Sequence, residues 1–268
     1  MKKTFLLSCL MLAAMPVMAA YTGHVYVDKN KNGVFDQSEK PLAGIKVSDG
    51  LNVVETAADG SFTLPGHERE RFIFITTPSG YKTFNRHYHK IEKKQSGYDF
   101  GLIPYSGRIR KNGSHRYIHI ADTEIFNTEN HADWVNNVHD YARNEQAAFI
   151  IHTGDICYEK GLKAHIKLMN TENMDCPVFY CIGNHDLVKG KYGEELFESI
   201  YGPVYYSFDA GNVHYVVTPM PGGDHAPGYT SDDVCRWLKN DLAHIRPGTS
   251  VVVFNHDLLT YEDAFIFK

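Results

Sequence analysis

The hydrophobic pattern of the chain changes near residue 105, and this change constrains the fold more than any other feature. From Thr22 to about Tyr105, short runs alternate apolar and polar residues and end at turn signals such as Asp49-Gly50 and Asp59-Gly60. Strict alternation is the period of half-buried strands, and Asp-Gly pairs favour hairpin turns. We therefore predict an all-β sandwich of the prealbumin or immunoglobulin type, with antiparallel strands, over residues 20–105.

A basic and polar stretch at residues 106–114 is interpreted as a linker to a second domain over residues 115–268. Runs typical of strands lie at 116–122, 147–155, 177–186, 204–209, 213–218 and 249–257. Amphipathic runs typical of helices lie at 131–146, 163–171 and 232–245. A short hairpin at 209–212 interrupts the alternation, which predicts an α/β domain with mixed β-sheets flanked by helices. The last strand is continuously apolar and is expected to be buried.

Four of these predicted strands end in residue types that bind metal ions. Asp122, Asp155 and His256 each close one strand, and Asn184 with His185 closes another. Because the carboxyl ends of strands in an open α/β fold lie at one edge of the sheet, we expect these side chains to meet. Each residue also has an ordinary alternative as a turn residue, a helix cap or a buried histidine. Four such endings in series favour a functional site.

The residue types at the strand ends suit divalent metal chemistry. Carboxylates, an amide oxygen and imidazoles bind hard or borderline cations such as Mg²⁺, Mn²⁺, Zn²⁺ or iron, and a central aspartate can bridge two of them. Two cations roughly 3.5–4 Å apart can clamp the attacking and leaving oxygens of a phosphoryl displacement. The pattern predicts metal-assisted hydrolysis of a small-molecule or polymer phosphoester. A net charge of −5 argues against nucleic acid as a bulk partner.

Four short motifs resemble the first four motif blocks of the calcineurin-like metallophosphoesterases. They are Asp122-x-Glu124, Gly154-Asp155-x-x-Tyr158, Gly183-Asn184-His185-Asp186 and Asn255-His256. This resemblance implies that Asp122 binds a first metal ion, that Asp155 bridges two ions, and that Asn184 and His256 bind the second. It also implies that His185 contacts the phosphate and protonates the leaving oxygen, with a metal-bound hydroxide as nucleophile. The N-terminal sandwich is similar to one that precedes some exported members of the family.

The first motif departs from the usual family pattern. That block normally reads Asp-x-His, but Glu124 stands where the histidine is expected. Purple acid phosphatases also lack this histidine and use a tyrosine at the position of Tyr158, so Tyr158 or Glu124 could complete the first metal site. The alternative for Tyr158 is an aromatic side chain packed beside the loop. A tyrosine ligand would make ferric iron a candidate, because phenolate is a hard, anionic donor.

The closing Gly-His-x-His block of the family is missing, and the sequence ends at Lys268, shortly after His256. We interpret the chain as a phosphoesterase whose catalytic domain is incomplete at its C-terminus. The rival interpretation is a non-catalytic surface or binding protein that carries a vestigial phosphoesterase domain.

Two further features leave alternatives open. His152, just before Gly154-Asp155, is either a residue that holds a metal ligand by a hydrogen bond or a core histidine. The Gly/Pro-rich segment Pro219–Thr230 is either an irregular connection, which we favour, or a substrate wall formed by Asp224, His225 or Tyr229.

Residues 1–19 are predicted to be a cleaved signal peptide. Two lysines precede an apolar run too short to span a bilayer, and small residues follow at Ala19 and Ala20. No later segment is long and apolar enough to cross a membrane. We therefore expect an exported protein of the periplasm, the cell surface or the extracellular space.

The stretch VDKNKNGVFDQSE has the ligand spacing of a calcium loop. The oxygen donors fall at Asp28, Asn30, Asn32, the Val34 carbonyl, Asp36 and Glu39, with Gly33 at the sharp turn. The flanking pattern predicts strands, so the loop is expected to be a structural calcium clip rather than a helix-loop-helix sensor. Three carboxylates predict weak binding, with a Kd of roughly 10⁻⁴–10⁻³ M. The alternative is a simple Asn-Gly turn.

Overall fold

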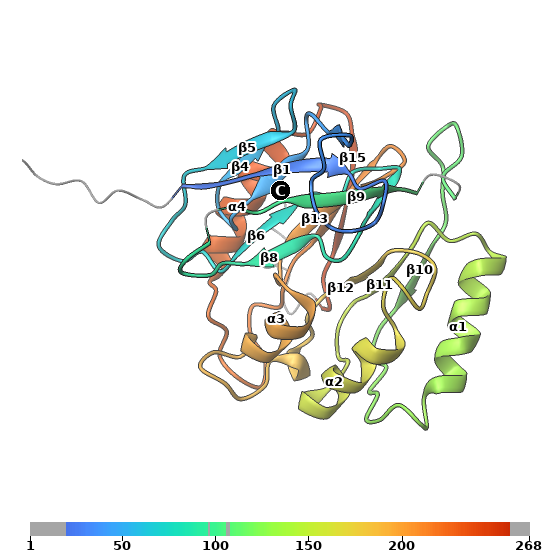
Figure 1. The fold of residues 1–268 in the computed structure, drawn as a ribbon. Coiled ribbons are helices and arrows are strands. Elements are labelled where there is room, and N and C mark those ends of the chain that lie inside the picture. Colours follow the sequence, from blue (N-terminus) through green and yellow to red (C-terminus); the bar gives the residue numbers. More distant parts are fainter. Residues whose placement is uncertain (1–19, 96, 106–107, 258–268) are drawn as a thin grey trace, which may run out of the picture.

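The computed structural model describes residues 20–95, 97–105 and 108–257. The predicted signal peptide, residues 1–19, lies outside the described residues, and so do residues 258–268. None of the described helices has the length and apolar character needed to cross a bilayer. The N-terminal region, residues 20–105, is built of strands, and the C-terminal region, residues 108–257, combines strands with helices (Figure 1).

Two sheets make up the N-terminal region. The strands of the first are β1 (Tyr21–Val27), β2 (Lys40–Pro41), β5 (Ser61–Leu64), β7 (Tyr81–Thr83) and β9 (Phe100–Pro104). Their order is β2-β1-β9-β7, with β5 paired to β1. The strands of the second, in spatial order, are β4 (Val53–Glu55), β3 (Lys46–Ser48), β6 (Phe72–Ile75) and β8 (Tyr88–Lys90).

The two N-terminal sheets share one hydrophobic core. Val25 and Leu102 of the first sheet and Val47, Ile73 and Ile75 of the second lie in a single buried cluster, each fully inaccessible to solvent. Each fully buried Val, Leu or Ile side chain contributes about 1.5–3 kcal/mol through removal of its apolar surface from water. The region is therefore two β layers held by one core, and its prealbumin or immunoglobulin type stays a prediction.

Two details of the predicted β-region were wrong. The strands are not all antiparallel, because β1 and β9 pair in parallel through Val25, Tyr26 and Val27. Asp49-Gly50 does join a hairpin, β3 to β4, but Asp59-Gly60 does not. That turn joins β4 to β5, and β5 pairs with β1 in the other sheet. An Asp-Gly turn specifies only the local reversal of the chain, and the partner of the next strand is decided by core packing.

The C-terminal region contains two further sheets with helices. The parallel sheet has the strands β10 (Tyr117–Ile120), β11 (Phe149–His152) and β12 (Val178–Tyr180). The mixed sheet has the strands β13 (Tyr206–Ala210), β14 (Val213–Val217) and β15 (Ser250–Phe254). The helices are α1 (Ala132–Asn144), α2 (Tyr158–Leu168), α3 (Glu195–Tyr201) and α4 (Ser231–Ala243), with a 3₁₀ turn at Asn184–Asp186. The predicted mixed sheets with flanking helices are present.

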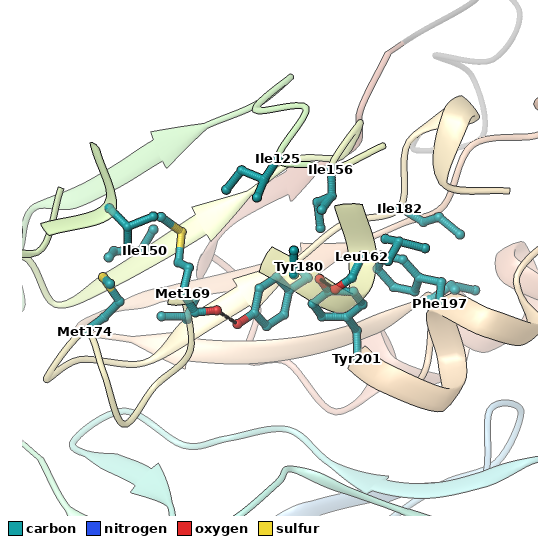
Figure 2. Packing of buried hydrophobic residues seen from close by; sticks show 14 of the residues in the cluster. Ile125, Ile150, Ile156, Leu162, Met169, Met174, Tyr180, Ile182, Phe197 and Tyr201 are labelled. Atoms are coloured by element: carbon teal, nitrogen blue, oxygen red, sulfur yellow. Dashed lines mark hydrogen bonds between the residues drawn. The ribbon is translucent and has the colours of Figure 1, made fainter. Parts of the chain in front are cut away.

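Helices α2 and α3 pack against the parallel sheet. Figure 2 shows Tyr180 of β12 lying between Met169 and the side chains of Leu162 and Tyr201. The buried phenols do not lack partners, because the Tyr180 hydroxyl donates to the Met169 carbonyl at 2.7 Å and the Tyr201 hydroxyl to the Leu162 carbonyl at 2.9 Å. The core thereby fixes α2, which follows the Asp155 loop, against the parallel sheet.

One boundary and the burial of one strand in this region differ from the prediction. Helix α2 begins at Tyr158 rather than at residue 163, so Tyr158 opens a helix instead of lying in a loop. The strand expected to be buried, β15, has Val251 41% exposed. Among the described strands β15 pairs with β14 alone, and an apolar run by itself does not distinguish an edge strand from a central one.

The N-terminal and C-terminal regions also share a core. Phe72 and Phe74 of β6 lie in one buried cluster with Phe208 of β13 and Trp237 of α4. In Figure 1 the blue to green strands of the N-terminal region lie beside β13 and α4. The backbones meet as well, since the Asp209 N–H donates to the Thr77 carbonyl at 2.8 Å. The segment at 106–114 thus separates the two regions in sequence but not in space.

A buried polar seam lies next to this shared core. The imidazole of His214 bonds Asp209 at 2.6 Å and Asp241 at 2.7 Å, and only 1% of its side chain is exposed. Lys46 of β3 pairs with Asp209 at 3.2 Å. Burial alone would lower the pKa of His214, but the hydrogen bonds to the two carboxylates raise it to about 9. The imidazolium therefore neutralises charge at the junction of the two regions.

Candidate active site

Strand direction brings the ends of β10, β11 and β12 to one edge of the parallel sheet. Asp122 follows β10, Asp155 follows β11, and Asn184 with His185 follows β12. His256 comes just after β15, which runs parallel to β14 in the neighbouring sheet. The loops touch at the site, because the Asp122 N–H donates to the Gly154 carbonyl at 3.0 Å.

Three of the predicted ligands come together as a metal-binding geometry. One ligand atom from each of Asp122, Asp155 and His256 lies within 4.8 Å of the other two. Asp122 is exposed, Asp155 is buried and His256 is half-buried. His256 Nε2 lies 3.5 Å from Asp155 Oδ2. Two carboxylates and one imidazole form a donor set that fits a divalent transition metal ion or Mg²⁺.

The orientation of His256 is the one expected of a metal ligand. Its Nδ1–H donates to the Thr153 carbonyl at 2.7 Å, which leaves Nε2 facing Asp155. Metal-binding histidines commonly donate their second N–H to a backbone carbonyl in this way. The hydrogen bond to Asp155 raises the pKa of His256 to about 9. A divalent cation held between the two groups would take the place of the imidazole proton.

Asp155 stands at the centre of the site. Its Oδ2 faces His256, and its Oδ1 accepts the His185 N–H at 3.1 Å. Burial favours the neutral acid, yet the hydrogen bonds from His256 and from the His185 backbone hold the pKa of Asp155 below its usual value. The carboxylate is therefore charged at neutral pH, as a bridging ligand must be.

Several non-glycine residues in the site loops have a left-handed backbone conformation. Positive φ angles occur at Asp122 (52°), Glu124 (43°), Asp155 (52°), Cys157 (78°) and Tyr158 (50°). Each such conformation at a non-glycine residue costs of order 1–3 kcal/mol and persists only where surrounding contacts enforce it. Conformational strain of this kind collects at functional sites, and here it coincides with the predicted ligands.

Glycine is required at two positions because the Asp155 and His185 loops are in backbone contact. A Cβ at Gly183 would lie 2.2 Å from Asp155 Oδ1, and a Cβ at Gly154 would lie 2.5 Å from the Gly183 nitrogen. Gly154 also has φ of 99°. The glycines of the Gly-Asp and Gly-Asn-His motifs are therefore required for the two loops to pack closely.

Two buried residues hold the ligand loops together. His152 Nε2–H donates to Thr123 Oγ1 at 2.8 Å, and its Nδ1 accepts the Gly154 N–H at 3.2 Å. Burial lowers the pKa of His152 well below its ordinary value, so the ring is neutral. Asp186 accepts the Gly183 N–H at 3.0 Å and the Cys157 N–H at 2.8 Å. His152 thus bonds the loops rather than a ligand side chain, and the sequence motif alone gives no sign of the role of Asp186.

His185 lies beside the cluster, with its ring open to solvent. Its Nδ1–H donates to Asp224 Oδ2 at 2.9 Å, and 37% of its side chain is exposed. The Asp224 hydrogen bond raises the pKa of His185, although burial opposes the shift. An imidazolium at this place could donate a proton to an incoming group. Asp224 lies in the segment for which we had favoured an irregular connection, whereas Tyr229 of that segment is buried and does not form a wall.

The remaining predicted ligands, Tyr158, Glu124 and Asn184, lie on the loops of the site. Tyr158 is 49% exposed and its ring centre is 5.5 Å from that of His185. Glu124 is exposed and its N–H donates to the Asp155 carbonyl at 3.4 Å. Asn184 is half-buried and opens the 3₁₀ turn directly before His185. The metal-binding roles of these three residues stay predictions.

The predicted calcium loop is held by its own hydrogen bonds. The Asp28 carboxylate accepts the N–H groups of Asn32 at 3.1 Å and Gly33 at 2.9 Å. Glu39 accepts the N–H groups of Lys29 at 2.9 Å and Asp36 at 3.2 Å. The side-chain amides of Asn30 and Asn32 both donate to Asp36, and the Val34 N–H donates to Asn32. Calcium binding by this loop stays a prediction.

A second group of possible metal ligands, Asp49, His67 and Glu70, lies in the N-terminal region. Its imidazole is engaged at both nitrogens. His67 Nδ1 accepts the Arg69 N–H at 3.2 Å, and Nε2–H donates to the Asp49 carbonyl at 3.1 Å. Neither nitrogen presents a free lone pair to a cation, so this group is explained by hydrogen bonding alone.

The α/β scaffold with carboxylates and an imidazole at its strand ends defines a metal-dependent hydrolase-type site. Residues 115–263 match the family model described as calcineurin-like phosphoesterase, and residues 29–104 match the N-terminal domain of calcineurin-like phosphoesterase. The first match alone covers more than half of the chain, which therefore belongs to the calcineurin-like phosphoesterases. A search of curated proteins found no match for this chain. Family membership implies a phosphoesterase that uses divalent metal ions.

Proposed function

We propose that the protein hydrolyses phosphomonoesters or phosphodiesters outside the cytoplasm with two metal ions. The observation that carries this proposal is the convergence of Asp122, Asp155 and His256 to within 4.8 Å. Asp122 would hold the first ion, His256 and Asn184 the second, and Asp155 both. The proposed location rests on the sequence of residues 1–19.

When bound, two divalent cations polarise phosphoryl oxygens and lower the pKa of water towards neutrality. The chain supplies the rest. Asp155 keeps its charge through the hydrogen bonds described above, and His152 and Asp186 hold the ligand loops in register. His185 presents its imidazole beside the cluster, where it would contact the phosphate and donate a proton to the leaving oxygen. Tyr158 or Glu124 would complete the first metal site.

The test uses protein expressed from the full reading frame of the gene and purified with Mn²⁺, Zn²⁺ or iron. We expect metal-dependent turnover of an aryl phosphate monoester or diester, and two metal ions per chain by elemental analysis. Asp155→Asn should abolish the turnover and lower the metal content. Asp232→Asn is the matched control, because that side chain is 79% exposed on α4 and pairs only with Arg236 among the described residues.

Turnover that is equal in wild type and Asp155→Asn would overturn the proposal. Absence of both turnover and bound metal would overturn it as well, and would favour a surface-binding protein with a vestigial site.

A further inference from the structure

The loop between β14 and α4, residues 219–230, places a carboxylate on His185. Asp224 Oδ2 accepts the Nδ1–H of His185 at 2.9 Å. This bond fixes the tautomer and the direction of the ring, because the proton on Nδ1 is engaged and Nε2 is the nitrogen left to face a substrate. Among the described residues no other side-chain carboxylate is hydrogen-bonded to the His185 ring, and Asp155 bonds only its backbone N–H.

The loop is seated directly on the turn that carries His185. The Asp224 N–H donates to the Asn184 carbonyl at 3.1 Å. Gly223 makes this approach possible, because a Cβ there would lie 2.4 Å from the Asn184 carbonyl oxygen. The Tyr229 hydroxyl donates to the Met220 carbonyl at 2.6 Å and draws the two ends of the loop together. Asp224 is thus placed by backbone contacts as well as by its own side chain.

The other side of the loop is anchored to the N-terminal region. The Gly228 N–H donates to Glu194 Oε2 at 2.9 Å, and the Gly193 N–H donates to the Ala226 carbonyl at 2.8 Å. Glu194 is fully buried and accepts Arg71 Nη2 at 2.9 Å. Arg71 comes from the chain just before β6, so one guanidinium joins the N-terminal region to the support of the loop.

We propose that Asp224 is the positioning residue of His185 and that the N-terminal region holds it in place through Arg71 and Glu194. This inference rests on the proposed function, in which His185 donates a proton to the leaving oxygen. It gives the N-terminal region a part in the reaction: it braces the loop that aims the proton donor. Asp224 is not one of the clustered ligands Asp122, Asp155 and His256, and it would act through His185.

The first test compares Asp224→Asn with the Asp232→Asn control across substrates of different leaving groups. A misaligned proton donor lowers kcat most for substrates with poor leaving groups. We expect kcat of Asp224→Asn to fall about 10-fold to 100-fold on alkyl phosphates and much less on nitrophenyl phosphate. KM, metal content and melting temperature should stay near wild type. If Asp224 had a merely structural role, the substitution would lower kcat equally for both classes of substrate.

A second readout does not depend on turnover. The ¹⁵N spectrum of wild-type protein with labelled histidine should show a protected Nδ1 proton on His185, and Asp224→Asn should lose it. An unchanged His185 signal in Asp224→Asn, or an equal loss of kcat on all leaving groups, would overturn the inference. Wild-type protein without turnover would overturn the proposed function instead, and the His185 signal would then decide the inference alone.

The N-terminal anchor is tested with Arg71→Met and Arg71→Lys. Lys keeps the charge but not the planar guanidinium, whose Nη2 reaches both Glu194 and Glu198. We expect Arg71→Met to show the same leaving-group dependence as Asp224→Asn in weaker form, and Arg71→Lys to recover part of it. Folded Arg71→Met protein with wild-type kcat on alkyl phosphates would remove the N-terminal region from the inference.

Discussion

Replacing Arg71 by methionine tests the ion network between the two regions. Arg71 Nη2 lies 2.9 Å from Glu194 and 3.0 Å from Glu198, whose side chains are 0% and 5% exposed. The guanidinium also lies 4.6 Å above the Tyr192 ring. The substitution keeps the apolar stem but leaves two buried carboxyl groups without a cation.

The expected cost follows from this geometry. Breaking a buried ion pair by removing one partner costs about 3–5 kcal/mol, because a charge stays buried without compensation. For a chain of this size each kcal/mol lowers the melting temperature by about 2–4 °C, so a drop of about 6–20 °C is expected. Replacing Glu198 by glutamine in the same chain should recover part of the loss.

The pH dependence has a definite sign. Burial raises the pKa of Glu198 to about 8 even though Arg71 opposes the shift. Because the folded protein holds this proton more tightly than the unfolded chain does, stability is fully present below the ordinary glutamate pKa and falls as pH rises through about 8. Arg71→Met should extend this loss of stability to higher pH. Glu198→Gln should remove the part of the pH dependence that comes from Glu198.

Urea unfolding followed by circular dichroism at several pH values measures both effects. If Arg71→Met unfolds within about 0.5 kcal/mol of wild type, the network behaves as a solvent-screened surface pair and the reasoning fails.

Three further predictions address other parts of the molecule. His214→Phe should destabilise the protein most at low pH. The pKa of His214 is raised to about 9 in the folded protein, so the imidazolium stabilises the fold fully below the ordinary histidine pKa and loses this effect as pH rises through 9. Equal decreases in melting temperature at pH 6 and pH 10 would contradict this. Gly183→Ala should lower metal content, since its Cβ would lie 2.2 Å from Asp155 Oδ1, whereas Gly222→Ala, which meets nothing within 4 Å, serves as the control. Calcium at ten times the expected Kd should stabilise the full chain by about 1.4 kcal/mol if the Asp28 loop binds it; equal melting points with calcium and with chelator would show that the loop is a hydrogen-bonded turn.

The strand-end residues could be predicted from the sequence because each lies where a regular pattern stops. Asp122, Asp155 and His256 follow apolar runs, and the topology of parallel strands brings such ends together. The order of strands in the N-terminal region was harder to predict from the sequence. The pairing of β1 with β9 joins segments far apart in the chain and is decided by packing.

The support of His185 could not be predicted. Asp224 lies in a Gly/Pro-rich loop without periodicity, and its meeting with His185 depends on Gly223 fitting against the Asn184 carbonyl. The role of Arg71 depends on the fold of both regions at once, and nothing in the sequence marks its partners Glu194 and Glu198 as buried. Contacts of this kind are set by tertiary structure and leave no local pattern.

The core that Phe72 and Phe74 share with Phe208 and Trp237 has a consequence for how the chain can be divided. A cut within residues 106–114 would uncover large aromatic side chains on both fragments, and exposed apolar patches of that kind promote aggregation. The two segments are therefore not interchangeable modules, and transplanting either onto an unrelated partner would require a redesigned contact face. Intact protein should melt in one cooperative transition despite its two family matches.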